Sequence, residues 1–104
     1  MTPEEAQEQL EEYRLMIDEV DRRIVALLNE RTAVVENIGR VKREAQLPVY
    51  EPKREDQVFA NITSANQGPL TTQAVRGIFE RIIDASRSIQ RLRMMQKPPE
   101  DPKC

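Results

Sequence analysis

Residues 3–44 read PEEAQEQLEEYRLMIDEVDRRIVALLNERTAVVENIGRVKRE, with no proline after Pro3 and a single glycine at position 39. Apolar residues recur through this stretch at steps of three and four: Leu10, Tyr13, Ile17, Val20, Ile24, Leu27, Leu28, Val35, Ile38 and Val41. This period predicts one amphipathic helix of about 40 residues. Thr2 and Pro3 suit its start, because a threonine hydroxyl caps unpaired backbone N–H groups and proline carries none.

The sequence after this stretch predicts two shorter helices. A loop is expected over 45–50, since Pro48 disfavours helix at the residue before it. A second helix then begins at Glu51-Pro52 and ends near Gly68-Pro69, and a third runs from Thr71 or Thr72 to about Gln96. Residues 97–104 are rich in proline and charge, and we expect a disordered tail. The predicted fold class is therefore all-α, with one long, one short and one medium helix.

Composition excludes several functional classes. The 104 residues include no histidine and one cysteine, at position 104, so histidine-based zinc sites, Ser-His-Asp triads and disulfides within one chain are impossible. The net charge of -2 disfavours a dedicated nucleic-acid binder. No apolar run is long enough to span a bilayer, and the acidic N-terminus shows no secretory signal. We expect a single cytoplasmic domain without metal or cofactor; an enzyme of this composition must work without histidine.

The length of the first helix bears on assembly. A helix of 40 residues is about 60 Å long, whereas a compact domain of this size has a radius of gyration of about 13 Å. The two shorter helices therefore cover only part of its apolar stripe, and a second chain is expected to cover the rest. A twofold homodimer is the commonest solution. On periodicity alone, a plain antiparallel coiled coil without chemistry fits equally well.

Polar residues interrupt the apolar stripes of all three predicted helices. On the first helix Arg31 and Lys42 fall within the stripe, about 16 Å apart along the axis, and Arg14 lies on its flank. Ser86 and Gln90 continue the stripe of the third helix, and the second begins with a cluster of three charged residues: Glu51, Arg54 and Glu55. Each has an ordinary structural explanation, such as snorkelling, ion pairing, back-bonding of a serine to its own helix, or acidic residues at a helix start. Burying so many polar and charged side chains is costly unless each is paired within the protein or binds a ligand.

The position of Arg14 predicts a site shared between two chains. Arg14 is seventeen residues from Arg31, about 25 Å along a straight helix, so the two cannot meet within one chain. In an antiparallel dimer, Arg14 of one chain reaches the region of Arg31 and Lys42 of the other. The resulting cluster is rich in fixed donors and has no histidine or cysteine nucleophile. It suits a small dianion, because guanidinium groups match carboxylates.

These residues closely resemble those of the all-α chorismate mutase family, the intertwined helical type. The resemblance runs from about Leu10 to Gln96. It rests on Arg14-x-x-Ile17-Asp18, Leu27-Leu28-x-x-Arg31, Ile38-Gly39-x-x-Lys42, Pro48-Val49-x-Glu51-x-x-Arg54-Glu55 and Ile82-Ile83-x-x-Ser86-x-x-x-Gln90. The spacings between these elements fit as well. The family typically has Asp or Glu at the position of Glu51, so Glu51 is at most a mild variation on the family pattern.

The resemblance implies a fold, a reaction and a set of residue functions. It implies a chorismate mutase-like helical domain over residues 1–96, an intertwined homodimer, and the [3,3] rearrangement of chorismate to prephenate on the route to Phe and Tyr. Arg14 of the other subunit and Arg31 would bind the substrate carboxylates with help from Ser86. Lys42 and Gln90 would hydrogen-bond the ether oxygen, and Glu55 would take the ring hydroxyl. Glu51 and Arg54 would line that side.

Two other functions fit the same pattern. Isochorismate–pyruvate lyases share the fold and the cations, but Glu55 and Ser86 favour the mutase. Domains of this family also serve as regulatory modules, fused to or in complex with the first enzyme of the shikimate route, so a partner enzyme from that route is a further expectation.

Overall fold

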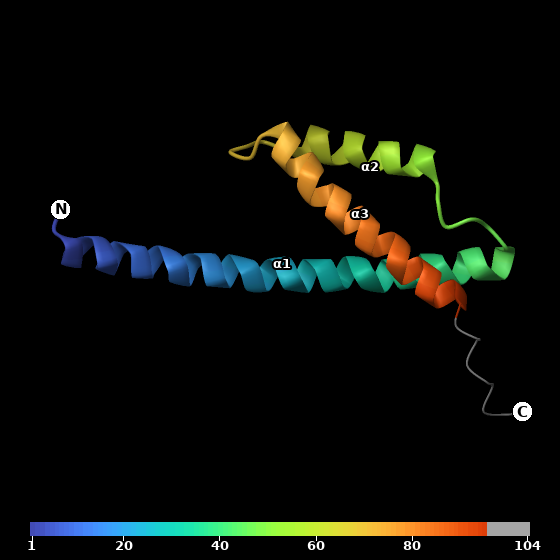
Figure 1. The fold of residues 1–104 in the computed structure, drawn as a ribbon, viewed down its shortest axis with the longest axis horizontal. Helices are drawn as coiled ribbons and strands as arrows, with labels where there is room; N and C mark the ends of the chain where they lie inside the picture. The colour runs from blue at the N-terminus through green and yellow to red at the C-terminus, as the bar shows by residue number, and fades with distance from the viewer. Residues whose placement is uncertain (96–104) are drawn as a thin grey trace, which may run out of the picture. The chain divides into compact units, whose positions relative to one another are not determined.

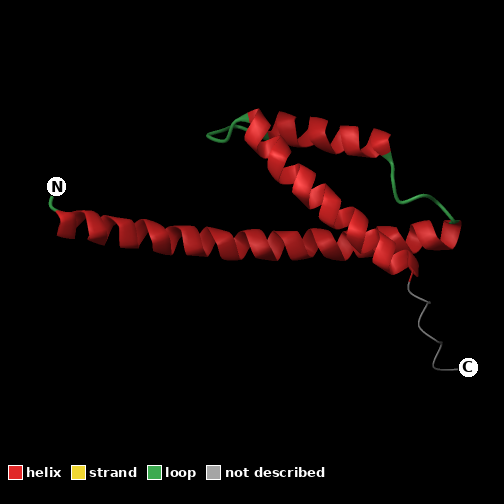
Figure 2. Cartoon of the chain, viewed as in Figure 1, coloured by secondary structure: helices red, strands yellow, loops and turns green. Residues whose placement is uncertain are grey.

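The computed structural model describes residues 1–95, which form three α-helices and no strand (Figure 1, Figure 2). The helices are α1 (Pro3–Ala45), α2 (Pro52–Ala65) and α3 (Thr72–Met95). The all-α, three-helix prediction is confirmed, with helix ends close to those expected. The predicted disordered tail over 97–104 lies outside the described residues. No helix within 1–95 is long and apolar enough to cross a membrane.

The two ends of α1 are closed by different devices. At the start, the backbone N–H of Glu5 donates to the Thr2 hydroxyl at 3.1 Å, so Thr2 is the cap that its sequence position predicts. At the end, Gln46 adopts a left-handed conformation with φ 57°. The N–H groups of Gln46 and Leu47 then donate back to the carbonyls of Arg43 and Lys42 at 3.2 and 2.8 Å. This is a Schellman motif without glycine. The helix therefore ends at Ala45, ahead of the residues whose conformation Pro48 restricts.

Short polar contacts turn the chain from α2 into α3. The Asn66 side chain accepts from the Gly68 N–H at 3.0 Å and donates to the Leu70 carbonyl at 2.9 Å. Thr71 then caps α3, accepting from the Ala74 N–H at 3.1 Å through its hydroxyl. This connection brings α2 and α3 into contact near the turn, and the two helices diverge from there (Figure 1).

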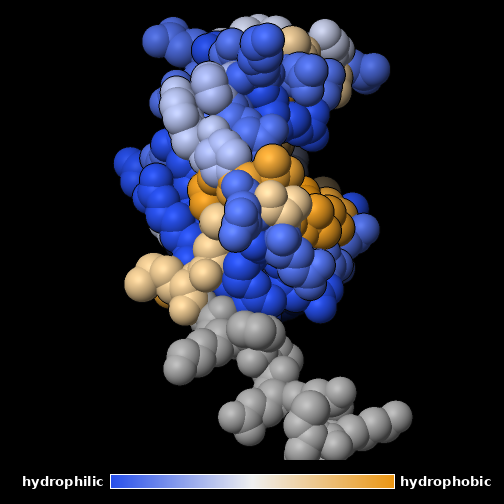
Figure 3. Space-filling model, turned by 90° about the vertical axis from the view of Figure 1, so that its right-hand side faces the viewer, coloured by the Kyte–Doolittle hydropathy of each residue, from blue (hydrophilic) through white to orange (hydrophobic). Residues whose placement is uncertain are grey.

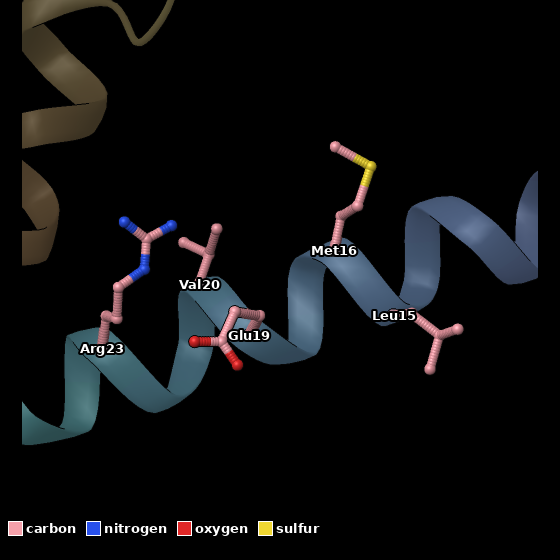
Figure 4. Close-up of a pocket in the computed structure, with 5 residues that line it drawn as sticks. All are labelled: Leu15, Met16, Glu19, Val20 and Arg23. Atoms are coloured by element: carbon pink, nitrogen blue, oxygen red, sulfur yellow. The ribbon is translucent and has the colours of Figure 1, made fainter.

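By its contacts the chain divides into two units, Met1–Ala33 and the residues from Val34 onward. The first unit is helical from Pro3 onward, and large apolar side chains are exposed along it: Leu10, Tyr13, Leu15, Met16, Ile17, Val20, Ile24, Val25, Leu27 and Leu28. A shallow depression on this part of α1 is lined by Leu15, Met16, Glu19, Val20 and Arg23 (Figure 4). None of these five belongs to the polar set predicted from the sequence.

The second unit contains the buried side chains. Its apolar core consists of Val35 on α1 with Val75 and Ile83 on α3. Two polar side chains, Lys42 and Ser86, are buried to the same degree as these three. Apolar residues also remain at the surface, where Figure 3 shows a hydrophobic patch surrounded by hydrophilic residues. A core this small makes the burial of a lysine the feature that calls for a functional explanation.

Candidate functional site

Lys42 is the buried cation at the centre of the candidate site. Its ammonium group donates to three oxygens: the Val49 carbonyl at 3.0 Å, Gln90 Oε1 at 2.8 Å and Glu51 Oε1 at 2.8 Å. A lysine ammonium has three N–H donors, so all of them are used. The acceptors come from α3 and from the segment between α1 and α2, and the contacts therefore bring three parts of the chain to one atom.

Gln90 is positioned by a close crossing of α1 and α3. Gly39 lies one turn before Lys42, and a Cβ at this position would be 3.3 Å from Gln90 Cα and 3.1 Å from Arg93 Cβ. Only glycine allows this approach without a shift of α3. Arg93 also pairs with Glu36, and Arg43 donates to the Arg93 carbonyl at 3.3 Å. The crossing thus holds the Gln90 amide next to the ammonium of Lys42.

The contact with Lys42 also orients the Gln90 amide. Because Oε1 accepts from the ammonium, the amide oxygen, and not the Nε2 donor, contacts Lys42. Lys42 and Gln90 thus bring a charged ammonium and a neutral amide side by side. Such a pair suits an oxygen that carries or gains negative charge.

Glu51 precedes α2 but does not cap it. Its side chain makes no capping hydrogen bond to the helix, and Pro52 occupies the first position, where an N–H would otherwise need a partner. The carboxylate instead pairs with Lys42, and its side chain is 48% exposed against 9% for the lysine. Among the three acceptors of Lys42, the Glu51 carboxylate is the one on a half-exposed, flexible side chain.

Glu55 forms a two-pronged ion pair with Arg87 of α3. Arg87 Nε donates to Glu55 Oε2 at 2.8 Å, and Nη2 contacts Oε1. Hydrogen bonding from Arg87 lowers the pKa of Glu55, assisted by the positive charges of Arg87 and Lys42 and opposed by partial burial. Glu55 is therefore a carboxylate down to lower pH than an ordinary glutamate, and it acts as an acceptor and not as an acid.

Ser86 and Arg54 make their hydrogen bonds within their own helices and not to Lys42. Ser86 is buried on α3, and its hydroxyl donates to the Ile82 carbonyl at 2.9 Å, the back-bonding expected of a helical serine. Arg54 is exposed on α2, and its Nη1 lies 3.4 Å from Gln57 Oε1 on the same helix. The structure thus brings Lys42, Glu51 and Gln90 into direct contact, whereas Arg54 contacts its own helix.

Arg14 and Arg31 belong to the first unit. Arg14 is exposed on α1, and Arg31 is half-buried and engaged with a partner. Both follow the helical spacing predicted from the sequence, because α1 is continuous from Pro3 to Ala45. The predicted contribution of Arg14 to a second chain stays a prediction.

Arg87 is the site residue that sequence reasoning missed. Its guanidinium holds Glu55, lies 3.3 Å from Asp84 Oδ1, and stacks on the Tyr50 ring with 5.4 Å to the ring centre. A signal was present, because Arg87 continues the four-residue series of Phe79 and Ile83 on the inner face of α3. A cation at that place in a core-facing series needs a partner.

The chemistry of the cluster is that of binding and charge stabilisation. It offers an ammonium, an amide and an oriented carboxylate, but no nucleophile with an adjacent base. Within residues 1–95 no group of three acidic or thiol side chains is placed to hold a metal ion. The arrangement suits a ligand with acceptor oxygens for the ammonium and the amide and a hydroxyl for the carboxylate.

Comparison with known proteins gives consistent matches. The family model described as chorismate mutase type II matches residues 13–91. A bifunctional chorismate mutase/prephenate dehydratase of Aquifex aeolicus is 36% identical over 88 residues, which are 81% of this chain and 24% of that protein. The chain thus spans about a quarter of the length of this relative.

The matches to two solved structures cover nearly the whole of each solved chain. Chorismate mutase of Thermus thermophilus (Form II) is 37% identical with a TM-score of 0.78, and the match covers 80% of this chain and 94% of that one. Chorismate mutase of Helicobacter pylori, solved in complex with prephenate, is 25% identical with a TM-score of 0.80, and the match covers 88% and 99%.

Proposed function

This chain belongs to the chorismate mutase type II family, and from that membership we propose that it catalyses the rearrangement of chorismate to prephenate, on the route to Phe and Tyr. The observation that carries the proposal is the buried ammonium of Lys42 beside the Gln90 amide. The relative from Helicobacter pylori was solved with the product of this reaction, prephenate.

The reaction needs what the cluster supplies. In a [3,3] rearrangement the ether C–O bond breaks while a C–C bond forms within one molecule, and no proton is transferred. The absence of histidine is therefore no handicap. Two effects lower the barrier: holding the enolpyruvyl arm over the ring, and placing fixed positive charge where the ether oxygen becomes negative.

Lys42 is proposed to donate to the ether oxygen in place of one of its present acceptors. Glu51 is the acceptor to be displaced, because it is half-exposed and joined to the protein by a flexible side chain. The Val49 carbonyl and Gln90 Oε1 stay in place and keep the ammonium aimed. Gln90 Nε2 then supplies the second, neutral donor to the same oxygen.

The remaining residues are proposed to bind the rest of the substrate. Glu55 accepts the ring hydroxyl, which suits its ionised state, with Glu51 and Arg54 on the same side of the ring. Arg31, and Arg14 of a second chain, bind the two carboxylates with help from Ser86. The exposed apolar side chains of residues 10–28 support a homodimer, because burying them requires another surface.

Residues 1–96 are proposed as the mutase domain. The relative from Aquifex aeolicus joins a mutase to a prephenate dehydratase within one longer chain. This joining of the domain to another enzyme favours a second candidate function, in which the domain acts with a separate partner, the first enzyme of the shikimate route, and is slow when alone. Adding such an enzyme to the mutase assay distinguishes the two, since only the second predicts a large increase in rate.

The direct test is turnover of the purified protein with two substrates. Chorismate should disappear and prephenate should form, whereas isochorismate should give no salicylate and pyruvate. Release of pyruvate from isochorismate without prephenate formation from chorismate would identify a lyase and overturn the proposal.

Gln90→Glu is expected to create an acid pH optimum. The new carboxyl donates to the ether oxygen only when protonated, and its ordinary pKa is about 4.3, lowered further by Lys42 at 2.8 Å from the present amide oxygen. We expect kcat at pH 7.5 to fall by about 10²–10³-fold, and to recover as the pH is lowered towards that pKa, by up to about tenfold per pH unit. The unaltered protein, whose amide donates at every pH, should show no such rise. A flat pH profile for Gln90→Glu between pH 5 and 8 would contradict this use of Gln90.

A further inference from the structure

Arg87 joins three parts of the second unit at one guanidinium. It extends from α3, pairs with Glu55 of α2, and lies over the ring of Tyr50 in the segment between α1 and α2. Asp84, one turn earlier on α3, contacts its Nη1 at 3.3 Å. The Arg87 side chain is 30% exposed and that of Glu55 19%. The pair is therefore shielded on several sides, and ordered in a way that an exposed surface pair is not.

The contact with Glu55 fixes the plane of the carboxylate. Nε and Nη2 of Arg87 engage the two different oxygens of Glu55, the side-by-side geometry that a guanidinium offers and an ammonium cannot. Each carboxylate oxygen has a second lone pair. Glu55 can thus still accept a hydrogen bond from a ligand hydroxyl while Arg87 fixes the orientation of its carboxylate.

The charges around Glu55 come from two helices besides its own. Arg87 faces it from α3 and Lys42 acts on it from α1, and both lower the pKa of its carboxyl. Arg87 is in turn held by Glu55 and Asp84, which raise the pKa of its guanidinium. A carboxylate with a lowered pKa keeps its charge through its ordinary titration range and loses it only as the pH falls through the lowered value. Removing Arg87 therefore moves the loss of that charge to higher pH.

We propose that Arg87 is a positioning residue that holds the Glu55 carboxylate in the orientation needed to accept the ring hydroxyl of the substrate. It acts through Glu55 and does not itself touch the substrate. The inference rests on the proposed mutase function for the identity of the ligand, whereas the coupling of Arg87 to Glu55 is a property of the protein alone. Tyr50 assists, since its ring covers the guanidinium and restricts its rotamers.

The experiment combines a titration without substrate and steady-state kinetics. Arg87→Met is compared with Arg81→Met, which removes an exposed arginine of the same helix. The Glu55 carboxyl is followed by carbon NMR between pH 2.5 and 7, its signal assigned by its loss in Glu55→Gln. In Arg87→Met the Glu55 midpoint should rise, and KM for chorismate should increase about 10- to 100-fold, the effect of losing hydrogen bonds to a charged group. The acid limb of kcat/KM should move to higher pH. Arg81→Met should match the unaltered protein in all three measurements.

Arg87→Lys separates charge from orientation. It keeps a cation near Glu55 but loses the fork, so the Glu55 midpoint should stay lowered while KM still rises. If Arg87→Met lacks the helical circular dichroism of the unaltered protein, the KM of Arg87→Lys is used instead to test whether Arg87 orients Glu55.

The outcomes distinguish this inference from the function on which it rests. Absence of chorismate turnover by the unaltered protein overturns the proposed function, and with it the ligand assigned to Glu55. Normal turnover by the unaltered protein, together with an unmoved Glu55 midpoint and unchanged KM in Arg87→Met, overturns the positioning by Arg87 alone. Unchanged KM in Arg87→Lys overturns the requirement for the fork.

Discussion

Replacing Lys42 with alanine is expected to lower kcat for chorismate by about 10²–10³-fold, the usual cost of removing one donor to a developing oxyanion. The ammonium is buried and held by the Val49 carbonyl and Gln90 Oε1, so it is aimed before the substrate arrives and loses little entropy on binding. Its charge interacts with the ether oxygen mainly when the C–O bond breaks. The loss should therefore appear in kcat more than in KM.

The control for this prediction is Lys53→Ala, which removes an exposed lysine at the start of α2 and should leave kcat unchanged. Helical circular dichroism and molecular size are measured for each variant, because removing Lys42 leaves Gln90 Oε1 and the Val49 carbonyl short of a donor. Gln90→Ala provides an independent measurement at the same site. Near-normal turnover in both Lys42→Ala and Gln90→Ala, with unchanged fold and size, would refute the site assignment.

Mixing two inactive variants is expected to restore activity. Arg14→Ala and Arg31→Ala should each lose about 10²–10³-fold in kcat/KM as homodimers, since each removes a carboxylate contact from both sites. In a mixed dimer, one site combines the Arg31 of one chain with the Arg14 of the other and is intact. With equal amounts and free exchange, half of the dimers are mixed and half of their sites work, so roughly a quarter of normal activity should return in a twofold dimer.

Subunit exchange has to be shown independently, for example with two chains of different mass tag. A mixture of Arg31→Ala with Lys42→Ala is the matched control, because both residues are proposed to serve a site from the same chain. In that mixed dimer each site keeps one lesion, so this mixture should regain no activity. Proven exchange without recovery in the mixture of Arg14→Ala and Arg31→Ala would contradict a shared site.

The helices were predictable because local signals agree with one another. The apolar period of residues 10–41, the cap at Thr2 and the breaks at Pro48 and Gly68-Pro69 point to the same three elements that the structure contains. The end of α1 was located correctly but for an incomplete reason. Gln46 in the left-handed conformation closes the helix, and glutamine gives no sequence signal for this conformation.

The candidate site was only partly predictable. The stripe positions of Lys42 and Gln90 put both in one predicted cluster, and the structure places Lys42 Nζ 2.8 Å from Gln90 Oε1. Glu51 and Glu55 were expected together at the start of α2, but they diverge, Glu51 to Lys42 and Glu55 to Arg87. Arg87 was missed, and Arg54 contacts its own helix, because partner choice among charged side chains depends on rotamers and distances that spacing along one helix does not determine.

The order of polar and apolar residues along the chain was enough to define the three helices, their inner faces and the polar residues that interrupt them. Helical periodicity is a local property, and it is written in residues three and four apart. The pairing of Lys42 with Gln90, the withdrawal of Glu51 from capping α2 and the fork from Arg87 to Glu55 came from the packing of one helix against another. These contacts join residues far apart in sequence, and their geometry depends on how closely the backbones approach, as Gly39 allows α1 to approach α3 beside Gln90.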